Sequence, residues 1–281
     1  MKIREFLMKI VFLLCACFSL IAVAAICIFL FANGLPAIRE IGITEFLLGK
    51  EWRPGQGKYG IFPMIVGSVY VTGGALLIGV PIGILCAVFM AYYCPKKIYG
   101  FFKTVIRLMA GIPSIVYGFF GLVVIVPAVQ MIFGTGGKGI LTASILLGIM
   151  VLPTIIETSE SSLRAVPPSY YEGSLALGAT KERSIFKVEM TAAKSGVASG
   201  VVLGIGRVIG ETMAVIMVAG NQPAIPGSIL SGVRTLTANI VLEMAYAAEL
   251  HREALIATAV VLFVFILIIN ICFSLLKRRM L

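Results

Sequence analysis

Arg207 and Glu211 are the residues whose types and placement point most directly to chemistry, because they lie within a long apolar stretch, residues 195–220. A guanidinium presents a planar set of N–H donors that fits two oxygens of an oxyanion. A nearby carboxylate can hold the guanidinium in place or limit how tightly the anion binds. The pair therefore predicts either an oxyanion site on a translocation path or a buried ion pair that only fixes helix packing.

Three glycines share a face with this pair if residues 195–220 are helical. At about 100° per residue, Gly196, Gly200 and Gly204 fall within the same stripe as Arg207 and Glu211. Glycines four residues apart let another helix approach closely, and charged residues in a membrane face protein or a wet cavity. We therefore expect the stripe to face a neighbouring helix and Arg207 to point inward. Glu211, one helical turn further on, should offset the charge of Arg207.

The composition of the chain excludes a water-soluble fold and most enzyme classes. Of its 281 residues, 59% are hydrophobic and 13% are charged, whereas soluble domains are about 25% charged. One His and no Asp are present, so His-rich metal sites, Ser-His-Asp triads and aspartyl-phosphate chemistry lack their residues. We expect a protein that is not an enzyme and that needs neither a cofactor nor a metal.

Six apolar stretches are long enough to cross a bilayer, which takes about 20 residues of helix. The first could instead be a signal peptide, but its length favours a retained membrane anchor. The expected fold class is therefore all-α, a polytopic membrane protein with six transmembrane helices. The stretches are residues 10–32, 59–93, 108–137, 139–156, 195–220 and 254–276.

The distribution of positive charge predicts the orientation, because Lys and Arg are held on the cytoplasmic side. Fifteen of them lie at the two chain ends and in the second and fourth connections between spans, and seven lie in the alternate segments. Both termini are therefore expected in the cytoplasm. Residues 1–9 form the cytoplasmic N-terminus in this interpretation, and residues 10–281 form a single membrane domain.

The longest polar segment, about residues 157–196, is then cytoplasmic. Pro167 and Pro168 should stop the preceding helix, and Ser169 should cap a new one that ends at a left-handed Gly178. Thr180 should start a second short helix. Two short helices at an angle make a compact projection that can enter a groove on another protein.

This segment resembles the signature loop of ABC-importer permeases, which reads Glu-Ala-Ala, three residues, Gly, nine residues and Ile-any-Leu-Pro. The spacing is kept here, although Gly and Ser replace the two Ala and Thr191 replaces the closing Pro. The resemblance implies that the loop docks in a cleft on a cytoplasmic ATPase. The candidate coupling residues are then Glu172, Gly173, Ser174, Ala176, Leu177, Gly178 and Ala179.

Further stretches resemble the PstC family of phosphate permease subunits rather than importers in general. They are residues 52–54 with 59–63 and 67–68, residues 110–121, residues 141–143 with 152–154, and residues 204–215. The resemblance implies a type I ABC-importer permease fold in a bacterial or archaeal cell membrane, ATP-driven import of inorganic phosphate, and a transport role for Arg207 and Glu211. It also implies three partners: a PstA-like second permease, a PstB-like ATPase dimer and a PstS-like extracytoplasmic phosphate-binding protein.

Other transport functions stay open at this point. The chain could be the sister permease subunit PstA, or a permease for another oxyanion such as sulfate, although residues 110–121 favour the PstC family. It could also be a secondary transporter or channel that acts alone, with Arg207 and Glu211 as its ion site. The spacing from Glu172 to Gly178 argues against that alternative, because a carrier without an ATPase does not need it.

Overall fold

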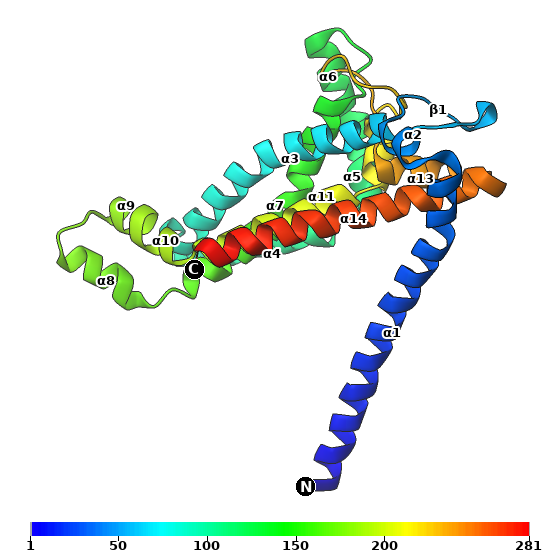
Figure 1. The fold of residues 1–281 in the computed structure, drawn as a ribbon. Coiled ribbons are helices and arrows are strands. Elements are labelled where there is room, and N and C mark those ends of the chain that lie inside the picture. Colours follow the sequence, from blue (N-terminus) through cyan, green and yellow to red (C-terminus); the bar gives the residue numbers. More distant parts are fainter. Residues whose placement is uncertain (1, 281) are drawn as a thin grey trace.

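The computed structural model describes the backbone of residues 2–280 and the side chains of residues 4–275. Lys2 and the tail residues Lys277, Arg278 and Arg279, which support the predicted orientation, have side chains outside the described part. Within that part, five helices are long and apolar enough to cross a membrane, and the pair Lys181–Ala192 and Lys194–Gly210, bent by 70°, brings the number to six if it is one span (Figure 1). The predicted all-α, six-span architecture is confirmed.

The spanning segments follow the apolar stretches of the sequence, with extensions and breaks at their ends. Two of them contain π-helical turns, named η2 and η3. In chain order they are α1 (Lys2–Ile41), α3 (Phe62–Val88) with η2 (Phe89–Tyr93), α5 (Ser114–Phe120) with η3 (Gly121–Ile125) and α6 (Val126–Phe133), α7 (Ile140–Arg164), α11 (Lys194–Gly210), and α14 (Glu249–Met280). The short helix α12 (Met213–Val218) follows α11 within the apolar stretch 195–220.

Helix α7 is the most buried of the spans, with 67% of its apolar window inside the protein. Helix α3 crosses it closely at small residues. A Cβ on Gly79 would lie 2.6 Å from Val151 Cγ1, and one on Gly83 would lie 2.7 Å from Ile155 Cγ2. Because glycine allows this approach, α3 and α7 form a dense centre against which the other spans lie.

The third span starts later than the apolar pattern predicts, because a proline interrupts the stretch. Residues 108–111 belong to the amphipathic helix α4 (Lys96–Gly111), and Pro113 is the N-cap of α5. A residue before proline favours an extended conformation, and Ile112 has φ −69° and ψ 126°. Helix α4 is therefore separate from the third span, and it contacts α7.

A small hairpin that the apolar pattern does not predict lies at one end of the molecule. Trp52 pairs with Tyr59 in an antiparallel ladder of two short strands, and both rings are buried in a cluster with Leu236 and Leu255. We call this the hairpin end. Its elements are α2 (Ile43–Leu48), β1 (Trp52–Arg53), the turn η1 (Pro54–Gln56), β2 (Lys58–Tyr59) and α13 (Leu236–Glu243).

The segment between α7 and α11 lies at the opposite end, which we call the α8 end (Figure 1). Helix α7 continues to Arg164 and α11 begins at Lys194, so both helices take up parts of the polar segment predicted at about residues 157–196. The remainder folds into short helices: α8 (Pro168–Ala176), α9 (Lys181–Arg183), the π-helical η4 (Ser184–Glu189) and α10 (Met190–Ala192).

Helix α1 projects away from the other spans over most of its length (Figure 1). Its contact with α14 lies near its C-terminal end, where a Cβ on Gly34 would lie 2.8 Å from Val260 Cγ2. None of its most apolar window is buried in this chain. The apolar faces of α1 are therefore free to contact lipid or another subunit.

Candidate functional site

Helix α11 lies against α7 through the glycine stripe that the sequence predicts. A Cβ on Gly204 would lie 2.8 Å from Val151 Cγ2, and Gly196 and Gly200 meet the side chains of α7 in the same way. The prediction that this stripe faces a neighbouring helix is confirmed, and small residues at the contact are its physical cause. Other residues on this face of α11, Arg207 among them, are therefore held beside α7.

Arg207 continues this stripe, and its side chain is bound to α7 by a hydrogen bond. Its Nη1 donates to the Thr154 hydroxyl oxygen at 3.2 Å. The sequence analysis missed Thr154, although a polar residue in the apolar run that faces the glycine stripe is a usable signal. Within the described part of the chain, Thr154 is the partner seen for this guanidinium. Since Arg carries five N–H donors, most of them can still bind an oxyanion.

Glu211 does not have the place that the helical wheel predicts. Helix α11 ends at Gly210, and Glu211 is extended with φ −70° and ψ 130°. Its Oε1 accepts the backbone N–H groups of Thr212 at 3.1 Å and Ala214 at 3.3 Å, at the start of α12. The expectation of one continuous helix with an Arg207–Glu211 ion pair is wrong, because these backbone donors, both in the described region, take up the carboxylate instead.

Arg207 and Glu211 nevertheless border one narrow crevice between α7 and the break in the fifth span. Its other walls are apolar and come from Leu147, Met150 and Val151 on α7, together with Val208. The crevice is too narrow to admit a water-sized molecule, and Arg207 is exposed at its edge in this chain rather than turned inward as predicted. The open donors of the guanidinium are therefore available to an anion on the exposed surface of this chain, and the nearby Glu211 carboxylate opposes tight binding.

The predicted pair of short helices is present at the α8 end, and its start differs from the prediction. Helix α8 begins at Pro168 with Pro167 as its N-cap, so Ser169 is inside the helix and does not cap it. Proline fits the first helical position because its missing N–H would have no partner there. The expected second helix is confirmed, since the Thr180 side chain caps it by accepting from the Arg183 N–H.

The turn between the two helices is tightly specified. Gly178 has φ +83°, its N–H donates to the Leu175 carbonyl, and the Ala179 N–H donates to the Ser174 carbonyl. These two hydrogen bonds form a Schellman motif, in which glycine is favoured because the residue is left-handed. The prediction that Gly178 ends the first helix is confirmed.

Most of the candidate coupling residues lie on the surface of this turn. Glu172, Gly173, Ala176, Leu177 and Gly178 are exposed, and the Leu177 side chain is 91% exposed. Ser174 is buried instead, and its hydroxyl donates to the Tyr171 carbonyl at 2.8 Å, while Ala179 is half-buried. The surface of the turn therefore carries an acidic residue, Glu172, and an apolar one, Leu177, while the hydrogen bond of the buried Ser174 stabilises the helix beneath them.

A hydrogen bond that the sequence analysis missed ties this segment to η2, the π-helical turn that follows α3. The Tyr92 hydroxyl donates to Glu189 Oε2 at 2.8 Å, and Glu189 is 3% exposed. The same hydroxyl lies 3.3 Å from the Leu163 carbonyl of α7. A buried carboxylate needs such a partner. Glu189 lies in the closing part of the signature. A charged residue at that place among apolar ones is the sequence signal that could have predicted a buried, hydrogen-bonded carboxylate.

A second carboxylate at the α8 end joins α4 to α7. Glu160 is 4% exposed, and its Oε1 accepts from Arg164 Nε at 2.6 Å and from the Tyr99 hydroxyl at 2.6 Å. Arg164 Nη2 also donates to the Met90 carbonyl at 2.8 Å. The turn η2 and the helices α4 and α7 are therefore bound together where they meet the α8 segment.

The hairpin end holds a third buried carboxylate, Glu243, which is paired with His251, the single histidine of the sequence. Glu243 accepts from Trp52 Nε1 at 2.8 Å, lies 2.9 Å from His251 Nε2 and forms an ion pair with Arg234. These partners come from β1, α14 and the loop before α13. The network fastens the hairpin to the last two helices, so these residues are needed for structure at this end.

The comparisons with known proteins agree with this geometry. Residues 79–281 match the family described as the inner membrane component of binding-protein-dependent transport systems. The chain belongs to that family. It is 39% identical over 91% of its length to a probable ABC transporter permease protein, YqgH, of Bacillus subtilis, covering 86% of that protein. It is also 33% identical over 87% of its length to the phosphate transport system permease protein PstC of Mesorhizobium japonicum, covering 81% of it.

Solved structures place the chain in the same fold class. A chain of the inward-facing MetNI methionine ABC transporter matches with a TM-score of 0.62 and 19% identity, over 82% of this chain and all of that one. A chain of a bacterial ABC transporter that imports the polysaccharide alginate matches with a TM-score of 0.61 and 14% identity, over 95% of both. The prediction of a type I ABC-importer permease fold is confirmed.

Proposed function

We propose that this chain is a permease subunit of an ATP-driven importer of inorganic phosphate and that it lines half of the translocation path. Relatives named as PstC phosphate permeases, 32–33% identical over 86–92% of the chain, support the substrate. The observation that carries the role of the site is the Arg207 guanidinium, which lies on a spanning helix, is exposed in this chain and donates to the Thr154 hydroxyl of α7. Arg207 binds phosphate oxygens, and the fixed Glu211 carboxylate keeps that binding weak enough for release.

The proposed complex has four kinds of subunit. A PstA-like permease supplies the other half of the path, a PstB-like ATPase dimer hydrolyses ATP, and a PstS-like protein delivers phosphate from outside. The exposed apolar surface of α1 and the family's dependence on a binding protein support partners of these kinds. In this proposal the chain has no ATP-binding site of its own and is a transport subunit rather than an enzyme.

The α8 end faces the cytoplasm in this proposal, together with both termini. Lys181, Arg183 and Lys187 are clustered there, and positive residues are held on the cytoplasmic side of a membrane. The exposed Glu172 and Leu177 then enter a cleft on the ATPase, as a short helix with an apolar edge can. The Tyr92–Glu189 hydrogen bond transmits the movement of this segment to η2 and through it to α3.

Uptake by reconstituted vesicles tests the proposal. The complete complex is placed in vesicles with ATP on the side of the ATPase, and uptake of radiolabelled phosphate is measured with and without excess unlabelled sulfate. We expect ATP-dependent uptake that sulfate does not suppress. Suppression by sulfate would mean a different oxyanion importer, and uptake without the ATPase would mean a transporter that acts alone. Either outcome would overturn the proposal.

A further inference from the structure

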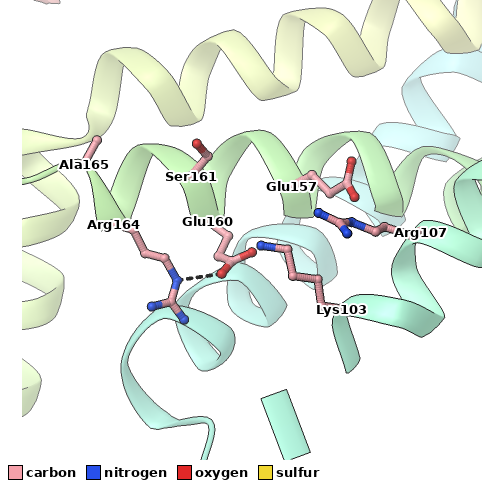
Figure 2. Close-up of a pocket in the computed structure, with 7 residues that line it drawn as sticks. All are labelled: Lys103, Arg107, Glu157, Glu160, Ser161, Arg164 and Ala165. Carbon is pink, nitrogen blue, oxygen red and sulfur yellow. Dashed lines mark hydrogen bonds and ion pairs between the residues drawn. The ribbon is translucent and has the colours of Figure 1, made fainter. Parts of the chain in front are cut away.

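A second polar pocket lies between α4 and α7 near the α8 end (Figure 2). Its volume is about 470 Å³, and since a water molecule takes up about 30 Å³ in the liquid, the pocket has room for a hydrated oxyanion. Figure 2 shows side chains from both helices converging on it. The lining residues are Lys103, Arg107, Glu157, Glu160, Ser161, Arg164 and Ala165.

The pocket has positive charge that its own carboxylates do not neutralise. Glu160 is buried and already bound by Arg164 and the Tyr99 hydroxyl. Lys103 Nζ donates to that same hydroxyl at 3.0 Å and forms no ion pair in the described region. Arg107 is exposed, and the described residues give its guanidinium no hydrogen-bond or ion-pair partner. Among the described residues of the pocket, Lys103 and Arg107 therefore have no ion-pair partner, and Glu157 is the one carboxylate that could balance them.

The pocket also continues the face of α7 that meets Arg207. Thr154, which binds Arg207, is followed on the same helical face by Glu157 and Ser161, three and seven residues further on. At about 1.5 Å per residue, Ser161 lies about 10 Å along the helix from Thr154. An anion that leaves Arg207 along α7 toward the α8 end therefore meets this pocket next.

We propose that the pocket binds a phosphate group through Arg107 and Lys103, at the side where the path leaves the membrane. This inference rests on the proposed import of phosphate. A guanidinium and an ammonium together match the oxygens of a phosphate group. Glu157 faces Arg107 across the pocket (Figure 2) and competes for it, which suits a site that must release its anion. The phosphate group is either the transported ion or the headgroup of an anionic lipid.

Arginine labelling of the complete importer tests the site directly. Complexes in phosphatidylcholine nanodiscs are treated with phenylglyoxal without ATP, and mass spectrometry gives the modification rate of Arg107. Arg53, which is exposed at the hairpin end, is the internal control. We expect inorganic phosphate, against chloride at equal ionic strength, to slow the modification of Arg107 several-fold and to leave Arg53 unchanged. A parallel arm replaces part of the lipid with phosphatidylglycerol and omits phosphate.

The variants separate binding from misfolding. Lys103→Gln should raise the phosphate concentration needed for protection by about tenfold, because it removes one charge-assisted contact. Glu157→Gln should lower that concentration, and a gain of binding cannot arise from a misfolded protein. Glu182→Gln, an exposed acid at the same end, should change nothing.

The phosphate and phosphatidylglycerol experiments together identify the source of the phosphate group and give the result that would refute the inference. Protection by phosphate in pure phosphatidylcholine assigns the site to the transported ion, and protection by phosphatidylglycerol alone assigns it to a lipid headgroup. An Arg107 rate that neither one changes overturns the inference. If the same purified complex, reconstituted in closed vesicles, imports phosphate while Arg107 stays unprotected in nanodiscs, only the pocket assignment fails. If the complex in vesicles imports no phosphate, the proposed function fails.

Discussion

Replacement of Gly204 by Ala tests whether the contact between α11 and α7 holds Arg207 in place. The new methyl group would lie 2.8 Å from Val151 Cγ2 and 3.3 Å from Ile155 Cγ1, which is closer than ordinary packing allows. Overpacking of this kind costs about 1–3 kcal/mol. Alanine also favours the helix by up to about 1 kcal/mol over glycine, so a matched control is needed to separate the two effects.

Gly206→Ala is that control, because a Cβ at Gly206 meets nothing within 4 Å among the described residues. Both variants gain the same helix propensity, so their stabilities should differ by about 1–3 kcal/mol, with Gly204→Ala the less stable. The thermal unfolding of the purified complex and its phosphate uptake are measured for both. Equal stability and equal uptake would refute the idea that this glycine contact positions Arg207.

The remaining predictions concern the charged and hydrogen-bonded side chains. Arg207→Gln should abolish uptake while the complex still assembles, and Arg207→Lys should retain only part of it because lysine lacks the planar fork; a complex that fails to assemble would favour a packing role. Glu172→Lys should abolish ATPase co-purification while membrane insertion, followed by protease protection, is normal. Tyr92→Phe should lower stability by about 1.5–3 kcal/mol, since it removes a hydrogen bond to the buried Glu189 carboxylate, and should reduce the phosphate imported per ATP hydrolysed. An unchanged ratio would contradict the coupling role of this hydrogen bond.

The sequence alone predicts the features that depend on composition and local spacing. The apolar stretches give the spans because a bilayer requires long uncharged helices. The glycine stripe predicts the approach of α11 to α7, and Gly178 predicts the end of α8, because each depends on what a missing Cβ permits at one position. The resemblance to importer permeases adds the fold and the family.

The sequence does not predict features that depend on tertiary contacts. The end of α11 at Gly210 is not visible in the apolar pattern, so the helical wheel wrongly joins Glu211 to Arg207. The partners of Glu160, Glu189 and Glu243 come from other elements of the fold, and sequence spacing does not show which donor will reach a buried carboxylate. The hairpin of β1 and β2 is too short to give a strand pattern, and its rings are held by α13 and α14.

The position of α7 explains how one chain can combine a fixed path with a movable end. This helix is the most buried span, and it carries Thr154 beside Arg207 and Glu160 beside Tyr99. The segment from α9 to α10, by contrast, meets α11 at a bend of 70°. If α8 moves with an ATPase, the bend takes up part of the displacement and the Tyr92–Glu189 hydrogen bond transmits the rest to η2, while the dense contact of α3, α7 and α11 resists it. Movement would then alter access to Arg207 more than the geometry of the anion site itself.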